Sequence, residues 1–452
     1  MDADQPPPQR LRLAILICVH ILICCVSLVY VARFKYPTAF DPAKFHIFYD
    51  PDRLYGVIAV AVAFALVSSL FVFARFSFGY FVGFYFYTMI LGYLWLNYFS
   101  DMSYDHQRAG FSAAISAVAF LLPALFISTS LRQRYVLSTT AFDRLLMFIL
   151  LLGAATAAVG ATYNFRFVAI ENINYFRDKI ESPTILRYLI GITSSALLPF
   201  AFAGFAARKA YWRAGAVLVL LIVFYPVTLT KTALFTPFWL IFILILTKFV
   251  EAKIVVILSR LVPMLTGLVL ITLFNAHAEQ YFSIVNFRMI TIPSAAMDIY
   301  NDFFSRHDLT YFCQISALKR IMHCPYQDQL SIVMHGAYKL GNYNASLFAT
   351  EGIASVGGLF APVTVFMCGL VIALGNRLSA GLPAGFVLIS GAILPQVLLD
   401  VPLTTVLLTH GAGILFLLWY ITPRAMFEAD DRTKMFGNER PTNLEVGSQT
   451  TT

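Results

Sequence analysis

Long apolar segments separated by short polar segments make up most of the chain. Each apolar segment is close to the roughly 20 residues that an α-helix needs to cross the hydrocarbon core of a bilayer. We therefore predict an all-α polytopic membrane protein with about 12 transmembrane helices. The predicted spans are 13–33, 54–74, 78–98, 111–128, 143–163, 186–206, 213–230, 233–248, 254–274, 350–374, 381–399 and 402–422.

One polar interval, residues 275–346, is much longer than the others. Apolar residues recur inside it at helical spacing over 293–304, 309–323 and 329–340. We predict a large loop on one side of the membrane that carries three short amphipathic helices on its surface, where such helices can fold over a cavity. The rest of the chain divides into an N-terminal tail (1–12), a single membrane domain (13–422) and a disordered polar tail (423–452).

The composition agrees with a membrane protein: 59% of the residues are hydrophobic, 12% are charged, and the mean hydropathy is +0.75. Soluble domains carry roughly a quarter charged residues. The net charge of +8 does not indicate nucleic-acid binding, because many basic residues lie in short loops between apolar segments.

Basic short loops mark the cytoplasmic side of a membrane protein. The short segments predicted on one side contain Arg10, Arg12, Arg75, Arg132, Arg134, Arg208, Lys209, Arg213, Lys248, Lys253, Arg377 and Arg424. We therefore predict that both termini are cytoplasmic and that the loop 275–346 faces outward.

The outward side also carries arginines, which oppose this rule. Arg166 and Arg177 lie in a short loop, whereas Arg288, Arg306 and Arg320 lie in the long one, and long loops are exempt from the rule. The arginine side chain is a planar, permanently charged fork that binds phosphate oxygens bidentately. These five residues are our candidate phosphate ligands, and the alternative is an outer face in which they form ion pairs with neighbouring carboxylates.

The cysteines and histidines do not indicate a metal or a cofactor. The histidines have no ligand spacing, carboxylates are few in the loops, and Asp50-Pro-Asp52 is an isolated pattern. Glycine-rich nucleotide motifs are absent. Cys313 and Cys324 would lie about 16 Å apart in an unbroken helix, too far for a disulfide. Pro325 allows a bend there, so the bridge remains an open alternative.

The string NYNASLFATEGIASVGGLFAPV (342–363) contains Asn344 at the entry to a span and Glu351 inside an apolar run. An ionisable residue within a span is by default a functional-site hypothesis. The alternative is a carboxylate that stabilises a helix N-terminus.

This string and three others resemble the bacterial oligosaccharide repeat-unit polymerases of the O-antigen polymerase type. The others are YNFRFVAIENINYFR, LTKTALFTPFWLI and FRMITIPSAAMDIYNDFF. The resemblance covers about residues 140–400 and implies a metal-independent, inverting glycosyltransferase at the periplasmic face of the inner membrane. The donor would be a polyprenyl-diphosphate-linked oligosaccharide, and the acceptor a hydroxyl of another lipid-linked repeat unit. The product would be a surface polysaccharide, an O-antigen or an exopolysaccharide. A chain-length regulator and a flippase are the implied protein partners.

The resemblance also implies roles for individual residues. Arg166, Arg177 and Arg288, with Arg306 and Arg320, would hold the diphosphates, and Asn344 would contact the substrate. The acceptor hydroxyl can require a general base, for which His335 and Glu351 are the candidates.

Three other functions compete with this interpretation. An O-antigen ligase would use the same chemistry with a different acceptor. A transporter or lipid flippase would line a central path with charges at mid-membrane depth, whereas most charges here are predicted in loops, with Glu351 as the main exception. A structural or assembly protein without chemistry is the third alternative.

Overall fold

The computed structural model describes residues 7–33, 42–169, 172–177, 180–274, 279–315, 318–340, 343, 346 and 349–427. This part of the chain is all-α, and ten of its helical segments are long and apolar enough to cross a membrane. These segments are Pro8–Arg33, Pro51–Phe73, Phe78–Leu96, His106–Phe126, Thr139–Tyr163, Thr184–Ala207, Tyr211–Thr228, Lys231–Phe249, Ala252–Phe274 and Ala349–Ser379. The predicted multi-pass membrane fold is therefore confirmed, whereas most of the predicted tail 423–452 lies outside the described residues.

The long helices are α1 (Pro7–Arg33), α4 (Phe78–Leu96), α5 (His106–Phe126), α6 (Thr139–Tyr163), α10 (Tyr211–Thr228), α11 (Lys231–Phe249), α12 (Ala252–Phe274) and α16 (Ala349–Ser379). Two further spans are built from shorter helices, namely α2 (Leu54–Ala65) with α3 (Ser69–Phe73), and α8 (Thr184–Ile192) with α9 (Leu198–Ala207). Short turns of 3₁₀- or π-helix join the members of each pair: η3 (Leu66–Ser68) and η5 (Thr193–Leu197).

The last two predicted spans are broken. Residues 381–399 form α17 (Ala384–Ser390) and α18 (Leu394–Asp400), each too short to cross. Residues 402–422 form α19 (Leu403–Thr409) and α20 (Ala412–Ile421), bent by 60° and counted together as one further span. Pro402 explains the break between α18 and α19, because a proline disfavours the helical conformation of the preceding residue and Val401 is extended. The described residues thus support ten to eleven spans rather than twelve.

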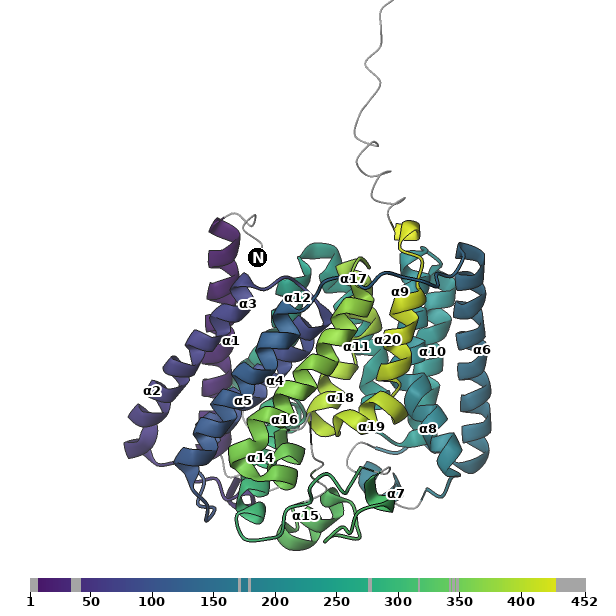
Figure 1. Cartoon of the computed structure of the whole chain (residues 1–452). Helices are drawn as coiled ribbons and strands as arrows, with labels where there is room; N and C mark the ends of the chain where they lie inside the picture. Colours follow the sequence, from purple (N-terminus) through teal and green to yellow (C-terminus); the bar gives the residue numbers. More distant parts are fainter. Residues whose placement is uncertain are drawn as a thin grey trace, which may run out of the picture.

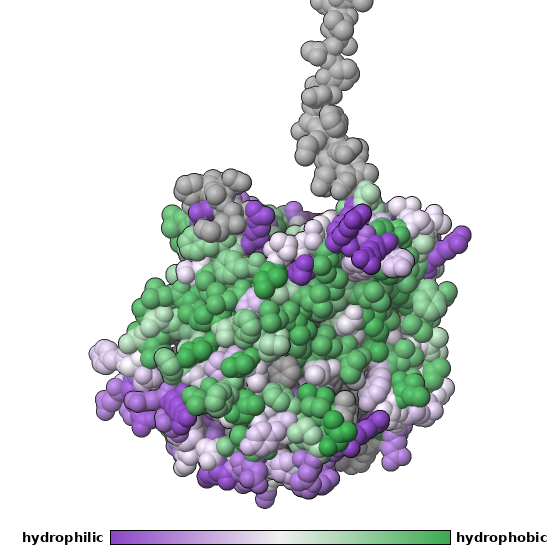
Figure 2. Space-filling view, in the orientation of Figure 1, coloured by the Kyte–Doolittle hydropathy of each residue, from purple (hydrophilic) through white to green (hydrophobic). Residues whose placement is uncertain are grey.

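The two ends of the bundle differ in what they carry. Figure 1 shows α1 beginning and α20 ending at the same end, with α7 (Ile173–Arg177) and α15 (Leu330–Tyr338) at the other. We call the latter the α15 end. Figure 2 shows a broad hydrophobic belt between hydrophilic residues at both ends, as expected for a protein that crosses a bilayer.

The centre of the bundle is α4, in which every residue from Phe78 to Leu96 is buried. It contacts helices on all sides, among them α1, α5, α12, α14 and α18. Aromatic residues dominate it, and their rings pack edge to face, for example Phe81 on Tyr85 and Phe86 on Phe120. Since lipid is as apolar as the helices, such packing rather than a hydrophobic driving force holds helices together in a membrane.

The predicted loop 275–346 is largely structured, and its first part is not a loop. α13 (Glu279–Phe282), the π-helix η7 (Ser283–Thr291) and α14 (Ile292–Phe304) follow one another without a break and pack against α1, α4, α12 and α16. The helix predicted over 293–304 is therefore confirmed, but its predicted place on the surface is wrong. All of Pro293–Phe304 is buried, because its polar side chains find partners inside: Ser294 donates to the Met89 carbonyl and Asn301 to the Tyr93 hydroxyl.

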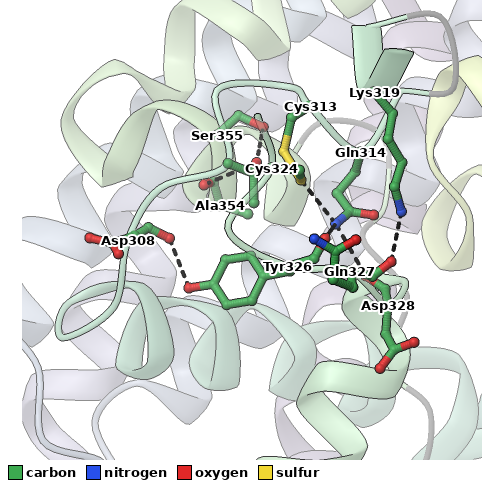
Figure 3. Close-up of a disulfide and its surroundings, with 11 residues drawn as sticks. Asp308, Cys313, Gln314, Lys319, Cys324, Tyr326, Gln327, Asp328, Ala354 and Ser355 are labelled. Carbon is green, nitrogen blue, oxygen red and sulfur yellow. Dashed lines mark hydrogen bonds between the residues drawn. A yellow bond between two sulfur atoms is a disulfide. The ribbon is translucent and has the colours of Figure 1, made fainter. Parts of the chain in front are cut away.

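The second predicted amphipathic helix, 309–323, is wrong. Tyr311 and Phe312 have left-handed backbone angles and the chain turns repeatedly. Among the described residues of this segment, only Leu318–Arg320 forms a short 3₁₀-helix, η8. This fold brings the Cα atoms of Cys313 and Cys324 to 5.4 Å, and the two cysteines form a disulfide (Figure 3). The bridge is possible because the helix that would have separated them does not form. The third predicted helix is confirmed as α15.

A kink in α16 anchors this disulfide-bonded segment. Gly357 has φ +76°, a conformation that glycine adopts without strain, and it interrupts the hydrogen bonds of α16. The carbonyl oxygens of Ala354 and Ser355 instead accept hydrogen bonds from the backbone N–H groups of Thr310 and Tyr311, at 2.8 and 3.1 Å. The Thr310 and Ser355 hydroxyls also pair, at 3.0 Å (Figure 3). The segment is thus fixed to the beginning of α16.

Candidate functional site

Four of the five candidate phosphate ligands lie at or near the α15 end. Arg166 and Arg177 are exposed, Arg166 shortly after α6 and Arg177 at the end of α7. Arg320 is exposed in η8, and Arg306 forms an ion pair with the buried Asp302.

Arg288 occupies a different position, on the π-helix η7 inside the bundle. Its side chain is exposed although its neighbours Asn286, Phe287 and Ile290 are buried. It lies close enough to Asp400, at the end of α18, for an electrostatic interaction. It also acts on Tyr343: burial raises the pKa of that phenol, and the positive charge of Arg288 opposes the rise. π-helical turns are rare and are frequent at functional sites.

A second arginine, which the sequence analysis did not select, lies beside this position. Arg260 of α12 is completely buried. Its Nη2 donates to the carbonyl oxygen of Met289 at 2.7 Å, and its Nη1 donates to Oε1 of Gln396 at 3.1 Å. Its guanidinium carbon lies 4.4 Å from the centre of the Tyr85 ring, within cation–π range.

The contacts of Arg260 extend to a half-buried carboxylate. Gln396 Nε2 donates to Oδ2 of Asp400 at 3.2 Å, so Gln396 links the two charged residues across α12 and α18. Arg288 is connected to the same network through its neighbour Met289, whose carbonyl oxygen accepts the hydrogen bond from Arg260. The structure therefore brings Arg260, Arg288, Gln396 and Asp400 together, and we call these four residues the inner cluster.

The two candidate bases have different surroundings. Glu351 lies in the first turn of α16 and is buried, and its Oε2 has no hydrogen-bond partner among the described residues. It is close enough to Tyr300 for an electrostatic interaction, and the Tyr300 hydroxyl donates to the Tyr343 carbonyl at 3.1 Å. His335 is exposed on α15. Asn344 lies outside the described residues.

A separate polar network joins α14 to the connection between α4 and α5. Asp298 accepts hydrogen bonds from the Ser100 hydroxyl at 2.7 Å and from the Tyr104 hydroxyl. Oδ1 of Asn97 contacts the Tyr104 hydroxyl at 2.9 Å and Nδ1 of His106 at 2.7 Å. Burial raises the pKa of Asp298 to about 6. Within the described residues, no three His, Cys, Asp or Glu side chains come together as a metal site.

The sequence held a signal for the inner cluster. Arg260 is a charge in the middle of the predicted span 254–274, and Asp400 lies between two adjacent predicted spans. An ionisable residue within a membrane span is by default a candidate functional residue. The prediction that most charges lie in loops, with Glu351 as the main exception, is therefore wrong for Arg260, which also lies within a span.

Comparison with known proteins gave no match to a family, to a curated protein or to a solved structure.

Proposed function

We propose that the protein is a membrane glycosyltransferase that polymerises polyprenyl-diphosphate-linked oligosaccharide repeat units into a surface polysaccharide. The observation that carries this proposal is the position of Arg288. Its charge is exposed on an irregular helix inserted into the bundle and lies beside Asp400 and the buried Arg260. A cation held in this way is suited to bind a diphosphate whose lipid chain lies between helices.

The chemistry follows from the charge that develops. An acceptor hydroxyl oxygen forms a bond to the anomeric carbon of the donor sugar, and the bond from that carbon to the diphosphate oxygen breaks. The lipid diphosphate leaves with the bonding electrons, so negative charge grows on its oxygens. Fixed arginine donors stabilise that charge more in the transition state than in the ground state. Arg288, with Arg166 and Arg177, is assigned this role.

The proton of the acceptor hydroxyl needs a destination. Glu351 and His335 are the proposed acceptors, and removing a general base typically lowers the rate by about 10²–10⁴. Among the described residues, Oε2 of Glu351 has no hydrogen-bond partner, which supports a role in proton transfer because most buried carboxylate oxygens in proteins have one.

Two observations support an orientation in which the α15 end faces the periplasm and both termini are cytoplasmic. The disulfide Cys313–Cys324 lies at the α15 end, and disulfides persist in oxidising compartments. The basic connections such as Arg132–Arg134 and Arg208–Arg213 lie at the opposite end, as the charge rule requires for the cytoplasm. This proposal places the protein in a bacterial inner membrane.

A transporter or flippase is the second candidate function, and a specific observation favours it. The inner cluster places the buried Arg260 and the half-buried Asp400 inside the bundle, and Asp400 ends α18, which forms a broken helix with α17. Broken helices and intramembrane charges are features of secondary transporters. An O-antigen ligase shares the proposed chemistry and differs only in its acceptor.

Removing the gene from its host distinguishes these functions by the species that accumulates. We expect single lipid-linked repeat units on the periplasmic face and no long polymer, because export continues while joining stops. The measurement is the length of the polysaccharide on gels, combined with labelling of lipid-linked sugars by a membrane-impermeant reagent on spheroplasts.

Other outcomes contradict the proposal. Repeat units trapped on the cytoplasmic face would indicate a transporter, and full-length polymer left on the carrier lipid would indicate a ligase. Glu351→Ala and His335→Ala, expressed in the same strain, test the proton acceptors. If both variants restore normal polymer, neither residue is the base.

A further inference from the structure

Residues of α2 and α5 line a large groove. Figure 1 shows these two helices at the edge of the bundle. The volume of the groove is about 1160 Å³, above the roughly 300–1,000 Å³ of common small-molecule pockets. Ala63 and Phe64 form part of one wall and Phe111 and Ala114 part of the other. It is separate from the inner cluster, none of whose residues lines it.

The groove has a direction. From His106 to Leu122, both of which line it, α5 extends over about 24 Å at 1.5 Å per residue. The hydrocarbon core of one bilayer is about 30 Å thick. Beyond the first turn of α5, the residues that line the groove are apolar or small, and the last of them are Leu122 and Phe366. The groove therefore extends over most of the membrane depth.

Polar lining residues gather at one end only, which we call the mouth. Arg53, Asn97, Ser100, His106 and Gln107 lie there. The mouth is at the α15 end. The helix α1 begins at the opposite end and crosses the bundle once, so α2, which begins next to Arg53, starts at the α15 end. An apolar groove with a polar mouth at the membrane boundary matches a lipid, with its chain along the helices and its head group at the water.

The mouth carries positive charge suited to phosphate. Arg53 is half exposed; its Nε pairs with Oδ2 of Asp50 at 3.1 Å and its Nη1 donates to the Tyr98 carbonyl at 2.9 Å. An arginine has five N–H donors, so these two contacts leave donors for a ligand. Beside it, the ring nitrogens of His106 contact Oδ1 of Asn97 at 2.7 Å and the Met102 carbonyl oxygen at 2.9 Å, which fixes the imidazole at the mouth.

We propose that the groove between α2 and α5 holds the isoprenoid chain of the acceptor, the second lipid-linked substrate of the proposed reaction, with the phosphate of that lipid at Arg53. The inference rests on the proposed function, which supplies a long single-chain lipid phosphate. Ala63, Gly110 and Ala114 line the groove with small side chains, which leave room for an isoprenoid chain between the helices. The mouth also connects to α14, since Ser100 and Asn97 belong both to the mouth and to the network around Asp298.

The test measures binding without requiring sugar transfer. The purified full-length protein is placed in nanodiscs of phosphatidylethanolamine and phosphatidylglycerol. The probe is a long-chain polyprenyl phosphate with a photoactivatable diazirine in its chain, and labelled peptides are identified by mass spectrometry. We expect the label on α2 and α5.

Matched variants locate the site. Ala63→Trp fills the groove and should lower labelling about tenfold, whereas Val62→Trp adds the same side chain next to it, on a residue that is 63% exposed and does not line the groove, and should change nothing. Arg53→Ala should lower labelling about fivefold. The exposed Arg108, also at this end but outside the lining, is the control as Arg108→Ala.

The inference is overturned if Ala63→Trp is labelled like the wild type, or if excess phosphatidylglycerol displaces the probe as well as polyprenyl phosphate does, which would make the groove a site for bulk lipid. Its failure is distinguishable from failure of the proposed function. Polymerisation by a protein whose groove takes no label would contradict the inference alone. Labelling of the groove in a protein that transfers no sugar would contradict the proposed function alone.

Discussion

Arg288→Ala is expected to abolish long polymer while leaving the protein folded. Removing a preorganised donor to the developing charge typically lowers the rate by about 10²–10³. Stability should change little, because the Arg288 side chain is exposed and the helix that carries it is held by its buried neighbours. The measurement is polymer length on gels in a deletion strain, with protein amount followed by immunoblot.

Two further variants sharpen this prediction. Arg288→Lys keeps the charge but loses the planar fork, so most of the activity should still be lost. Arg108→Ala removes an exposed arginine at the same end and should leave polymer length unchanged. If the alanine variants of Arg166, Arg177 and Arg288 all make polymer of normal length, the assignment of these residues to the diphosphate is wrong.

Arg260→Met is expected to destabilise the folded protein strongly. The variant leaves the Met289 carbonyl and Gln396 without their partner inside the bundle. Leaving a buried hydrogen-bonding group without its partner typically costs about 1–3 kcal/mol. The measurement is thermal unfolding of the purified protein in detergent. Arg144→Met, at an exposed position of α6, is the control and should stay within about 0.5 kcal/mol of the wild type.

A double-mutant cycle separates the contact from a general effect of the methionine. Gln396→Leu should be costly in the wild type and nearly neutral once Arg260 is absent, because residues in one network do not act additively. Equal costs of Gln396→Leu in both backgrounds would show that Arg260 and Gln396 are not coupled.

The membrane fold could be predicted from the sequence because few backbone conformations are stable in lipid. Every N–H and C=O group in the hydrocarbon must be satisfied within the protein, so a long apolar segment becomes a helix. This constraint predicted even the closely spaced helices α10 and α11. It failed at 381–399, where the apolar pattern continues but α17 and α18 are separate helices.

The buried helix α14 was misplaced for a physical reason. Its alternating apolar and polar faces are typical of a surface helix. The partners that allow its polar face to be buried, such as Met89 and Ser100, lie about two hundred positions away and are invisible to local periodicity. The disulfide was left open for a related reason, since the pattern at 309–323 indicates a helix and the structure instead turns at Tyr311 and Phe312.

The candidate site was predicted in part. The sequence selected Arg288 and Glu351 by charge in an unusual context, and the structure gives both a distinctive environment. It did not select Arg260, Gln396 or Asp400, because a local pattern does not show that distant segments of the chain meet. The contacts between them join two helices, α12 and α18.

The most direct test of polymerase activity is a reconstituted reaction. The purified protein is placed in liposomes that contain a polyprenyl-diphosphate-linked repeat unit as the only glycan, and the products are separated by length. We predict a ladder of lipid-linked polymers that forms equally in excess EDTA, because the proposed chemistry relies on arginines rather than on a metal. Repeat units that stay single under these conditions, in a folded protein that still binds them, would contradict the account.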